Sequence, residues 1–218
     1  MRGSRLALAV GVTFVVAAGA AASASGPAPI PIWQRLLLAG EYKGFTPQAE
    51  SPQVGTPAVS AKATQNFFDA LKLPAVTAEF RKDGVVRGIS EDLNGPDKSR
   101  NGLSFVIQNS SSAGAARVVS YIDRASLLPC AHSCTVSAFE LKVPGIPGAL
   151  GTKRIRTTAE GPKPDQRPFE INFVFFANGP FAYGMASGGP PNGVDRGQLF
   201  AAAKRWYQRV KDSPPVPQ

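Results

Sequence analysis

The sequence predicts an α+β domain, with a mainly antiparallel sheet and about three helices packed on it. Segments with apolar residues at helical spacing alternate along the chain with segments rich in β-branched and aromatic residues. Tight turns join several of the strand-like segments, and such strands cannot be parallel because a parallel connection needs a long crossover. About 190 residues follow the N-terminal leader, which is enough for a single domain with a core.

The first 24 residues have the three parts of a secretory signal peptide. Arg2 and Arg5 form a basic start, an apolar run extends from Leu6 to Ala22, and small residues lead to Ala24. We expect cleavage after Ala24 and a secreted or cell-envelope protein. An uncleaved anchor is the alternative, because the apolar run approaches the roughly 20 residues that span a bilayer. No cysteine lies near this junction, which excludes the usual bacterial lipid attachment.

Proline marks both ends of the exported chain. It is frequent from Pro27 to Pro31 and again from Pro214 to Pro217, and such segments favour extended, poorly packed backbone. We therefore expect a proline-rich N-terminal extension at 25–57, the α+β domain at 58–211 and a disordered proline-rich tail at 212–218.

The first half of the domain should contain two helices and three strands. Apolar spacing predicts helices over Ser60–Leu73 and Ser112–Leu128. The predicted strands are Ala75–Arg81, Val85–Leu93 and Leu103–Gln108. Because Asp83-Gly84 separates the first two strands, we expect these to form a hairpin.

The second half should contain four strands and a closing helix. The strands are predicted over Thr135–Val143, Lys153–Thr158, Phe169–Ala177 and Phe181–Ala186. Polar residues alternate with apolar ones at the start of Phe169–Ala177, which then becomes apolar throughout, as in a strand entering the sheet centre. The helix is predicted over Val194–Lys211, with Asp195 as a candidate N-cap.

The two cysteines of the chain, Cys130 and Cys134, lie close together around its single histidine, His132. In an oxidising compartment we expect the cysteines to form a disulfide, with free thiols and a metal site as alternatives. A structural zinc ion usually needs four Cys or His ligands, and only these three residues could supply them. We therefore predict neither a metal site nor a cofactor.

The sequence contains no pattern typical of a catalytic site, so we do not expect an enzyme. Gly-x-Ser-x-Gly is absent, and His132 is the only imidazole that could act as a base. The glycines at 145, 148 and 151 lack the order of a phosphate-binding loop and fit a shaped connection. A secreted hydrolase remains an alternative if the fold gathers distant carboxylates such as Glu79, Asp92, Glu140 and Glu170.

The chain is basic, with a formal net charge of +9, and two of the arginines belong to the leader. A basic surplus favours anionic partners such as an envelope surface, although it also serves solubility. Nucleic-acid binding would need aromatic platforms among the charges, and we do not expect it. Two clusters could form an anion-binding patch or simply solvated faces: Lys153, Arg154 and Arg156, and Lys204, Arg205 and Arg209.

Four segments, 36–45, 143–149, 177–184 and 201–210, resemble uncharacterised secreted proteins of actinobacteria. The order of elements over 58–211 is similar to that of the PsbP-like fold and of LpqN-type mycobacterial lipoproteins. This resemblance implies a non-enzymatic binding domain at the cell envelope and assigns no functional residue. We therefore expect an exported, monomeric, non-catalytic domain that binds an unknown ligand, with a secreted hydrolase and a structural envelope component as alternatives.

Overall fold

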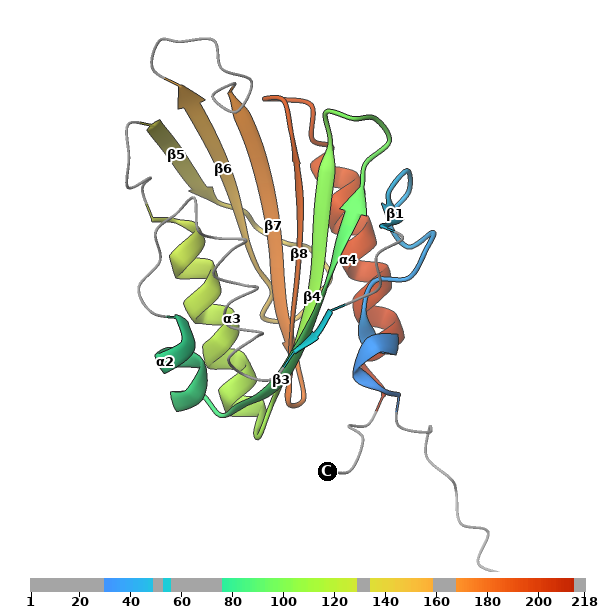
Figure 1. The fold of residues 1–218 in the computed structure, drawn as a ribbon, viewed down its shortest axis with the longest axis vertical. Helices are drawn as coiled ribbons and strands as arrows, with labels where there is room; N and C mark the ends of the chain where they lie inside the picture. The colour runs from blue at the N-terminus through green and yellow to red at the C-terminus, as the bar shows by residue number, and fades with distance from the viewer. Residues whose placement is uncertain (1–29, 49–52, 56–75, 129–133, 159–167, 214–218) are drawn as a thin grey trace, which may run out of the picture.

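Eight strands form one antiparallel sheet in the computed structural model, which describes residues 30–48, 53–55, 76–128, 134–158 and 168–213 (Figure 1). The order along the sheet is β1-β3-β4-β8-β7-β6-β5, and β2 also pairs with β3. The predicted α+β class is confirmed. The strands are β1 (Thr46–Pro47), β2 (Gln53–Gly55), β3 (Val85–Asn94), β4 (Asn101–Asn109), β5 (Cys134–Glu140), β6 (Leu150–Thr158), β7 (Phe169–Asn178) and β8 (Phe181–Gly189).

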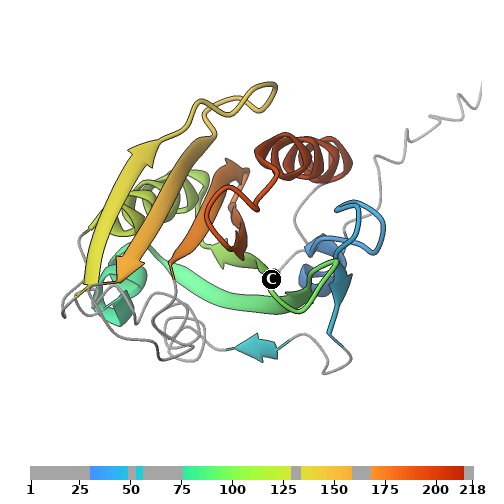
Figure 2. The same cartoon turned by 90° about the horizontal axis from the view of Figure 1, so that it is seen from above.

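Helices cover the sheet on both faces, as Figures 1 and 2 show. One face carries α2 (Val76–Lys82) and α3 (Ser112–Ser126), and the other carries the short 3-10 helix η1 (Ile32–Arg35) and α4 (Arg196–Val210). A separate hydrophobic cluster fills each interface. We call the two sides the α3 face and the α4 face.

The side-chain alternation of β7 supplies both cores. Phe173 and Phe175 belong to the cluster on the α3 face, whereas Val174 and Phe176 belong to the one on the α4 face. Successive side chains of a strand point to opposite faces, so a strand between two helical layers must be apolar throughout. The predicted position of this segment in the interior of the sheet is confirmed, because β7 lies between β6 and β8.

The two long helices begin at side-chain caps. The hydroxyl of Ser111 accepts a hydrogen bond from the Gly114 amide, and the carboxylate of Asp195 accepts one from the Gln198 amide at 3.1 Å. Each cap satisfies an amide that has no partner within the first turn of its helix. The predicted cap at Asp195 is confirmed.

The predicted strand Ala75–Arg81 is wrong, because residues 76–82 form the helix α2. This helix buries Phe80 and leaves Glu79 and Lys82 as an exposed ion pair on adjacent turns. The predicted hairpin is therefore also wrong: Gly84, with φ of +72°, turns the chain from α2 into β3. The predicted helix Ser60–Leu73 lies outside the described residues.

The folded domain begins well before residue 58. Within the segment 30–48, which we call the N-terminal segment, five apolar side chains are buried in the core on the α4 face. This part of the expected extension therefore packs tightly despite its proline-rich start. The five residues are Ile32, Leu36, Leu37, Tyr42 and Phe45. Within the ranges that the structure describes, no helix has the length and apolar character needed to cross a bilayer.

Candidate functional site

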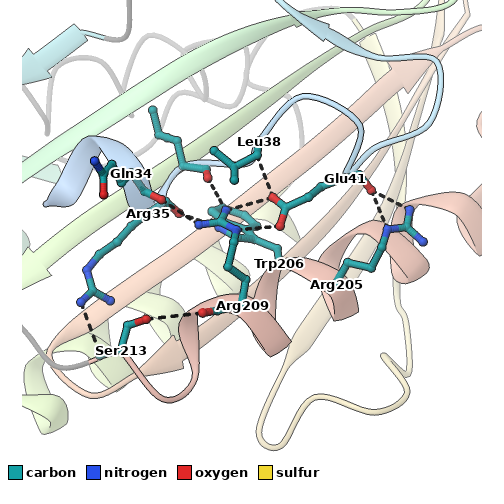
Figure 3. A network of polar contacts seen from close by, with 9 residues as sticks. Gln34, Arg35, Leu38, Glu41, Arg205, Trp206, Arg209 and Ser213 are labelled. Atoms are coloured by element: carbon teal, nitrogen blue, oxygen red, sulfur yellow. Dashed lines mark hydrogen bonds and ion pairs between the residues drawn. The ribbon is translucent and has the colours of Figure 1, made fainter. Parts of the chain in front are cut away.

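Two arginines of α4 hold the N-terminal segment in place (Figure 3). Arg209 donates to both carboxylate oxygens of Glu41, at 2.7 and 2.9 Å, and to the backbone carbonyls of Gln34 and Leu36. Arg205 donates to the backbone carbonyl of Glu41 through two nitrogens, at 3.0 and 2.6 Å. The sequence predicts for both residues either an anion-binding patch or a solvated face, and in the structure they bind acceptors of the protein itself.

A buried arginine in the N-terminal segment completes this attachment. Arg35 donates to the Tyr183 hydroxyl at 3.0 Å and to the Ser213 carbonyl at 3.2 Å, and its guanidinium lies 4.0 Å from the ring centroid of Phe181. The backbone carbonyl of Arg35 accepts a hydrogen bond from Trp206 Nε1 at 2.6 Å. The segment is therefore fixed to β8, to α4 and to the residues that follow α4.

The basic residues of β6 lie apart from those of α4. Arg154 is buried on the α3 face, where it donates to the backbone carbonyls of Ser126 and Leu128. Burial lowers its pKa to about 10, so it stays protonated at neutral pH. Arg156 is half-buried two positions along β6, and Lys204 is exposed on α4. The expected patch that joins Arg154 and Arg156 to Arg205 and Arg209 is not formed, because the sheet separates them.

A row of directly paired residues crosses the α4 face of the sheet. Phe139 pairs with Lys153, Lys153 with Asn172, and Asn172 with Ser187. Directly paired residues of antiparallel strands have their side chains on the same face. We call Phe139, Lys153, Asn172 and Ser187 the polar row.

Glu170 stands beside this row, two positions before Asn172. Its carboxylate accepts hydrogen bonds from the side-chain amide of Asn172 at 2.7 Å, from the Asn192 backbone amide at 2.9 Å and from Lys153 at 3.2 Å. Burial raises the pKa of Glu170, but these three donors outweigh it and lower the pKa overall. Glu170 is therefore a buried carboxylate held in its charged form.

One polar atom of the row has no partner in the structure. The side-chain oxygen of Asn172 is buried and accepts no hydrogen bond, while the amide nitrogen of the same side chain is used by Glu170. A buried acceptor without a donor costs about 1 to 3 kcal/mol. The side-chain oxygen of Asn172 can therefore accept a hydrogen bond from one further donor.

The two ends of the polar row differ from each other in solvent exposure. At the buried end, the Ser187 hydroxyl hydrogen-bonds to Tyr42, and burial raises the pKa of Tyr42 to about 12. At the open end, on the edge strand β5, the Phe139 side chain is 52% exposed. The row thus leads from an exposed aromatic ring to buried polar groups.

Only part of this row could be predicted from the sequence. Alternation in Phe169–Ala177 marked Glu170 and Asn172 as polar positions of a strand that is otherwise apolar. Their neighbours Phe139, Lys153 and Ser187 come from three other strands, and only the register brings them together.

The four carboxylates of the hydrolase alternative lie on four elements. Glu79 is on α2, Asp92 on β3, Glu140 at the end of β5 and Glu170 on β7. Glu140 pairs with Thr152, whose hydroxyl donates to Asp123 of α3 at 2.9 Å, so Glu140 and Glu170 lie on opposite faces. Among the described residues, no three His, Cys, Asp or Glu side chains are grouped as a metal site would require.

The predicted disulfide falls at the edge of what the structure describes. Cys130 and His132 lie outside the described residues, and Cys134 is described only as the first residue of β5. The pairing of Cys130 with Cys134 stays a prediction.

Comparison with known proteins gives likeness at the level of the fold. No protein-family model matches the chain, and no curated protein matches it. The extracellular domain of PknH from Mycobacterium tuberculosis superposes with a TM-score of 0.55 and 12% identity, over 85% of this chain and 98% of that one. A putative uncharacterised protein from Mycobacterium smegmatis, an Rv0999 orthologue, gives 0.42 and 11%, over 78% and 90%.

The likeness to the PknH domain shows that the two chains share a fold. At 12% identity it carries over no residue and no ligand. The PknH domain comes from an actinobacterium, and the resemblance in the sequence also pointed to actinobacterial proteins. Likeness to the PsbP-like fold or to LpqN-type lipoproteins is not shown. The chain is thus an α+β domain with the fold of a mycobacterial extracellular domain.

Proposed function

We propose that this protein is a non-catalytic binding domain that works outside the cytoplasm. Two independent features support the location. The chain begins with the three parts of a secretory signal peptide, and its fold matches 98% of the length of a domain that is itself extracellular. Fold alone does not define a function, so the ligand has to be argued from the residues of the site.

The binding surface in this proposal is the polar row with Glu170 beside it. The observation that carries the proposal is the exposed ring of Phe139 on the edge strand, in register with the mostly buried Lys153 and the buried Asn172 on the α4 face. Binding sites combine an apolar or aromatic surface with a few polar groups that fix orientation. The row has both.

The charges of the row favour a neutral, hydroxyl-bearing ligand of the saccharide class. Lys153 and Glu170 form an ion pair at 3.2 Å and cancel each other, so the site offers little attraction to a ligand of either sign. The side-chain oxygen of Asn172 is buried and still needs a donor, which a water molecule that bridges to a sugar hydroxyl can supply. The apolar face of a sugar ring can pack on Phe139.

Calorimetric titration with soluble oligosaccharides from bacterial cell walls tests this proposal. We expect binding by the wild type and a loss of roughly fivefold or more for Phe139→Ser, which removes the aromatic surface. Leu128→Ser is the matched control, because Leu128 is also exposed, at 40%, but lies after α3. Equal binding by wild type and Phe139→Ser would contradict the proposed site.

The same experiment separates binding from hydrolysis. A non-catalytic domain returns the oligosaccharide intact after prolonged incubation, whereas the hydrolase alternative predicts shortened products. If no oligosaccharide binds, the structural envelope component becomes the better account.

A further inference from the structure

The two edges of the sheet are built differently. One edge is formed by β1 and β2, which have two and three residues, and β1 contains Pro47. The other edge is β5, which has seven residues and keeps one register with β6 along its whole length. Figures 1 and 2 show β5 at the outer end of the sheet, and within the described residues no strand other than β6 pairs with it. One edge is therefore short and interrupted, whereas the other is long and regular.

β5 lacks the features by which soluble proteins keep an edge strand from pairing with another chain. Such features include a very short strand, a bulge, and a proline or lysine on the edge. The sequence of β5 contains no proline, lysine or arginine, and its register with β6 has no bulge. The side chain of Phe139 on this strand is 52% exposed. A long, regular edge with an exposed aromatic side chain favours pairing with a further strand.

The hydrogen bonds between β5 and β6 define which backbone groups face the open edge. The Leu141 amide, just after β5, donates to the Gly151 carbonyl at 2.7 Å. In an antiparallel ladder, residues that bond to one neighbouring strand alternate with residues whose amide and carbonyl point away from it. The amides and carbonyls of Val136, Ala138 and Glu140 therefore point away from β6, toward the open edge.

We propose that two copies of this protein pair through β5, antiparallel and about a twofold axis at Ala138. Ala138 then pairs with Ala138 of the second copy and Val136 with its Glu140, and each pair exchanges both of its hydrogen bonds. The two sheets become one continuous sheet through an interface that is the same on both copies, as a twofold axis requires. A dimer departs from the monomer expected on sequence alone, which does not show which strand lies at an edge.

Charge favours this register over its neighbours. Glu140 of one copy lies opposite Val136 of the other, and Val136 is directly paired with Arg156 on β6. Directly paired residues share a face, so the carboxylate and the guanidinium stand on the same side of the joined sheet, with about 10 Å between their Cα atoms. An axis at Phe139 would instead bring the two Glu140 side chains to diagonal positions, where like charges repel. An axis one residue the other way would move Glu140 two positions past Arg156.

The same register brings the exposed rings of the two copies together. On the α4 face, Phe139 lies opposite Ser137 of the second copy and diagonal to its Phe139, and aromatic side chains reach diagonal neighbours. The aromatic ends of the two polar rows then form one surface. The dimer does not depend on saccharide binding, and the variants that test it leave Phe139 unchanged.

Sedimentation equilibrium of the chain from Ser25 to Gln218, which contains every described residue, tests this proposal. A contact between two strands is small, so we expect reversible dimerisation with a dissociation constant of about 10 to 100 μM. Ala138→Pro should weaken it by at least about tenfold, because it removes the central outward amide from both copies. The bonds of β5 with β6 do not use this amide. Ala138→Ser keeps the amide and is the matched control, with dimerisation as in the wild type.

The contribution of charge is tested by reversing one side chain. Glu140→Lys should weaken dimerisation by roughly fivefold or more, because it places a like charge beside Arg156 of the second copy. Glu79→Lys is the matched control, since it makes the same change in net charge on α2, which contacts β3 on the other side of the sheet. Urea unfolding of each variant should confirm that the fold is intact.

Amide hydrogen exchange, followed by NMR, identifies the strand that pairs. The amides of Val136, Ala138 and Glu140 should exchange slowly at high protein concentration and rapidly on dilution. The Leu141 amide, which is bonded to Gly151 within one copy, should exchange slowly at both. Two results would overturn the proposal. One is the mass of a single copy up to about 1 mM, well above the expected dissociation constant, which would leave this edge to a strand from another protein. The other is a dimer in which the three outward amides exchange at the same rate at every concentration.

Discussion

Arg209 on the last helix holds Glu41 near the start of the domain through two hydrogen bonds of 2.7 and 2.9 Å. The two residues are 168 positions apart, and both side chains are mostly buried, with 24% and 14% of their surface exposed. The same guanidinium satisfies the carbonyls of Gln34 and Leu36, which belong to an irregular stretch of backbone. One side chain therefore closes the N-terminal segment onto α4.

Removal of this guanidinium should destabilise the domain. Arg209→Met keeps most of the side-chain volume but leaves the Glu41 carboxylate and two carbonyls without their donor. We expect a loss of about 3 kcal/mol in the free energy of unfolding, measured by urea denaturation at neutral pH. Arg124→Met, at an exposed position of α3, should change it by less than about 0.5 kcal/mol. A comparable loss in both variants would show that the attachment contributes little.

A close approach between β4 and β8 gives a second prediction. The ring of Phe105 lies over Gly184, so that a Cβ atom on Gly184 would stand 2.1 Å from the end of the ring. Gly184→Ala should cost about 3 kcal/mol of stability, because the ring has to leave its position in the core. The matched control is Gly148→Ala, where an added Cβ meets no neighbour within 4 Å. Its loss of stability comes only from placing a side chain on a residue with positive φ.

A double-mutant cycle checks the cause. Phe105→Leu removes the end of the ring, so adding it to Gly184→Ala should cost clearly less than the sum of the two single changes. Additive costs would mean that the ring and the glycine are not coupled.

The regular elements could be predicted from the sequence because their patterns are local. The helices α3 and α4 and most strands follow apolar spacing, and the cap at Asp195 follows from its position before such a pattern. The helix α2 was missed because its seven residues bury one large side chain, Phe80, and such a short segment has no period that separates helix from strand.

The N-terminal segment was missed for a different reason. Its buried residues Ile32, Leu36 and Tyr42 follow no period, because the backbone there is irregular and its hydrogen bonds come from α4 and from local turns. The basic cluster of α4 was visible in the sequence, but its partner Glu41 was not. Contacts across more than 160 positions leave no local pattern.

The candidate site was predictable only in part, because it depends on strand register. A shift of one residue in β6 would turn Lys153 toward the α3 face and Arg154 toward the α4 face. The register places Arg154 inside the α3 face and Lys153 beside Glu170. The sequence alone cannot distinguish the two arrangements, since both residues are basic.

Processing and the two cysteines give a third prediction. The mass of the secreted protein should correspond to a chain that starts at Ser25 with Cys130 and Cys134 joined. Alkylation without prior reduction should then leave both cysteines unmodified, whereas alkylation after reduction should label two thiols. A mature form that retains residues 1–24 would contradict the expected cleavage, and ready labelling without reduction would contradict the disulfide.

The buried carboxylate of Glu170 gives a prediction about acid. Its hydrogen bonds with Asn172, Asn192 and Lys153 outweigh burial and lower its pKa in the folded protein. A group whose pKa is lower in the folded state than in the unfolded state, about 4.3 for glutamate, stabilises the fold above that value. This contribution is lost as the pH falls through the lowered pKa, because the folded carboxylate must then take up its proton.

Glu170→Gln should therefore be less stable than the wild type at pH 7, by about 2 to 3 kcal/mol. The neutral amide lacks the negative charge that strengthens the hydrogen bonds from these donors. Below about pH 4 the wild type progressively loses this advantage, so the two unfolding free energies should converge. Urea denaturation at a series of pH values between 7 and 3 measures both. Glu79→Gln, which removes an exposed ion pair with Lys82, should follow the wild type within about 0.5 kcal/mol throughout. A constant difference between Glu170→Gln and the wild type over this range would show that the charge of Glu170 is not what stabilises the fold.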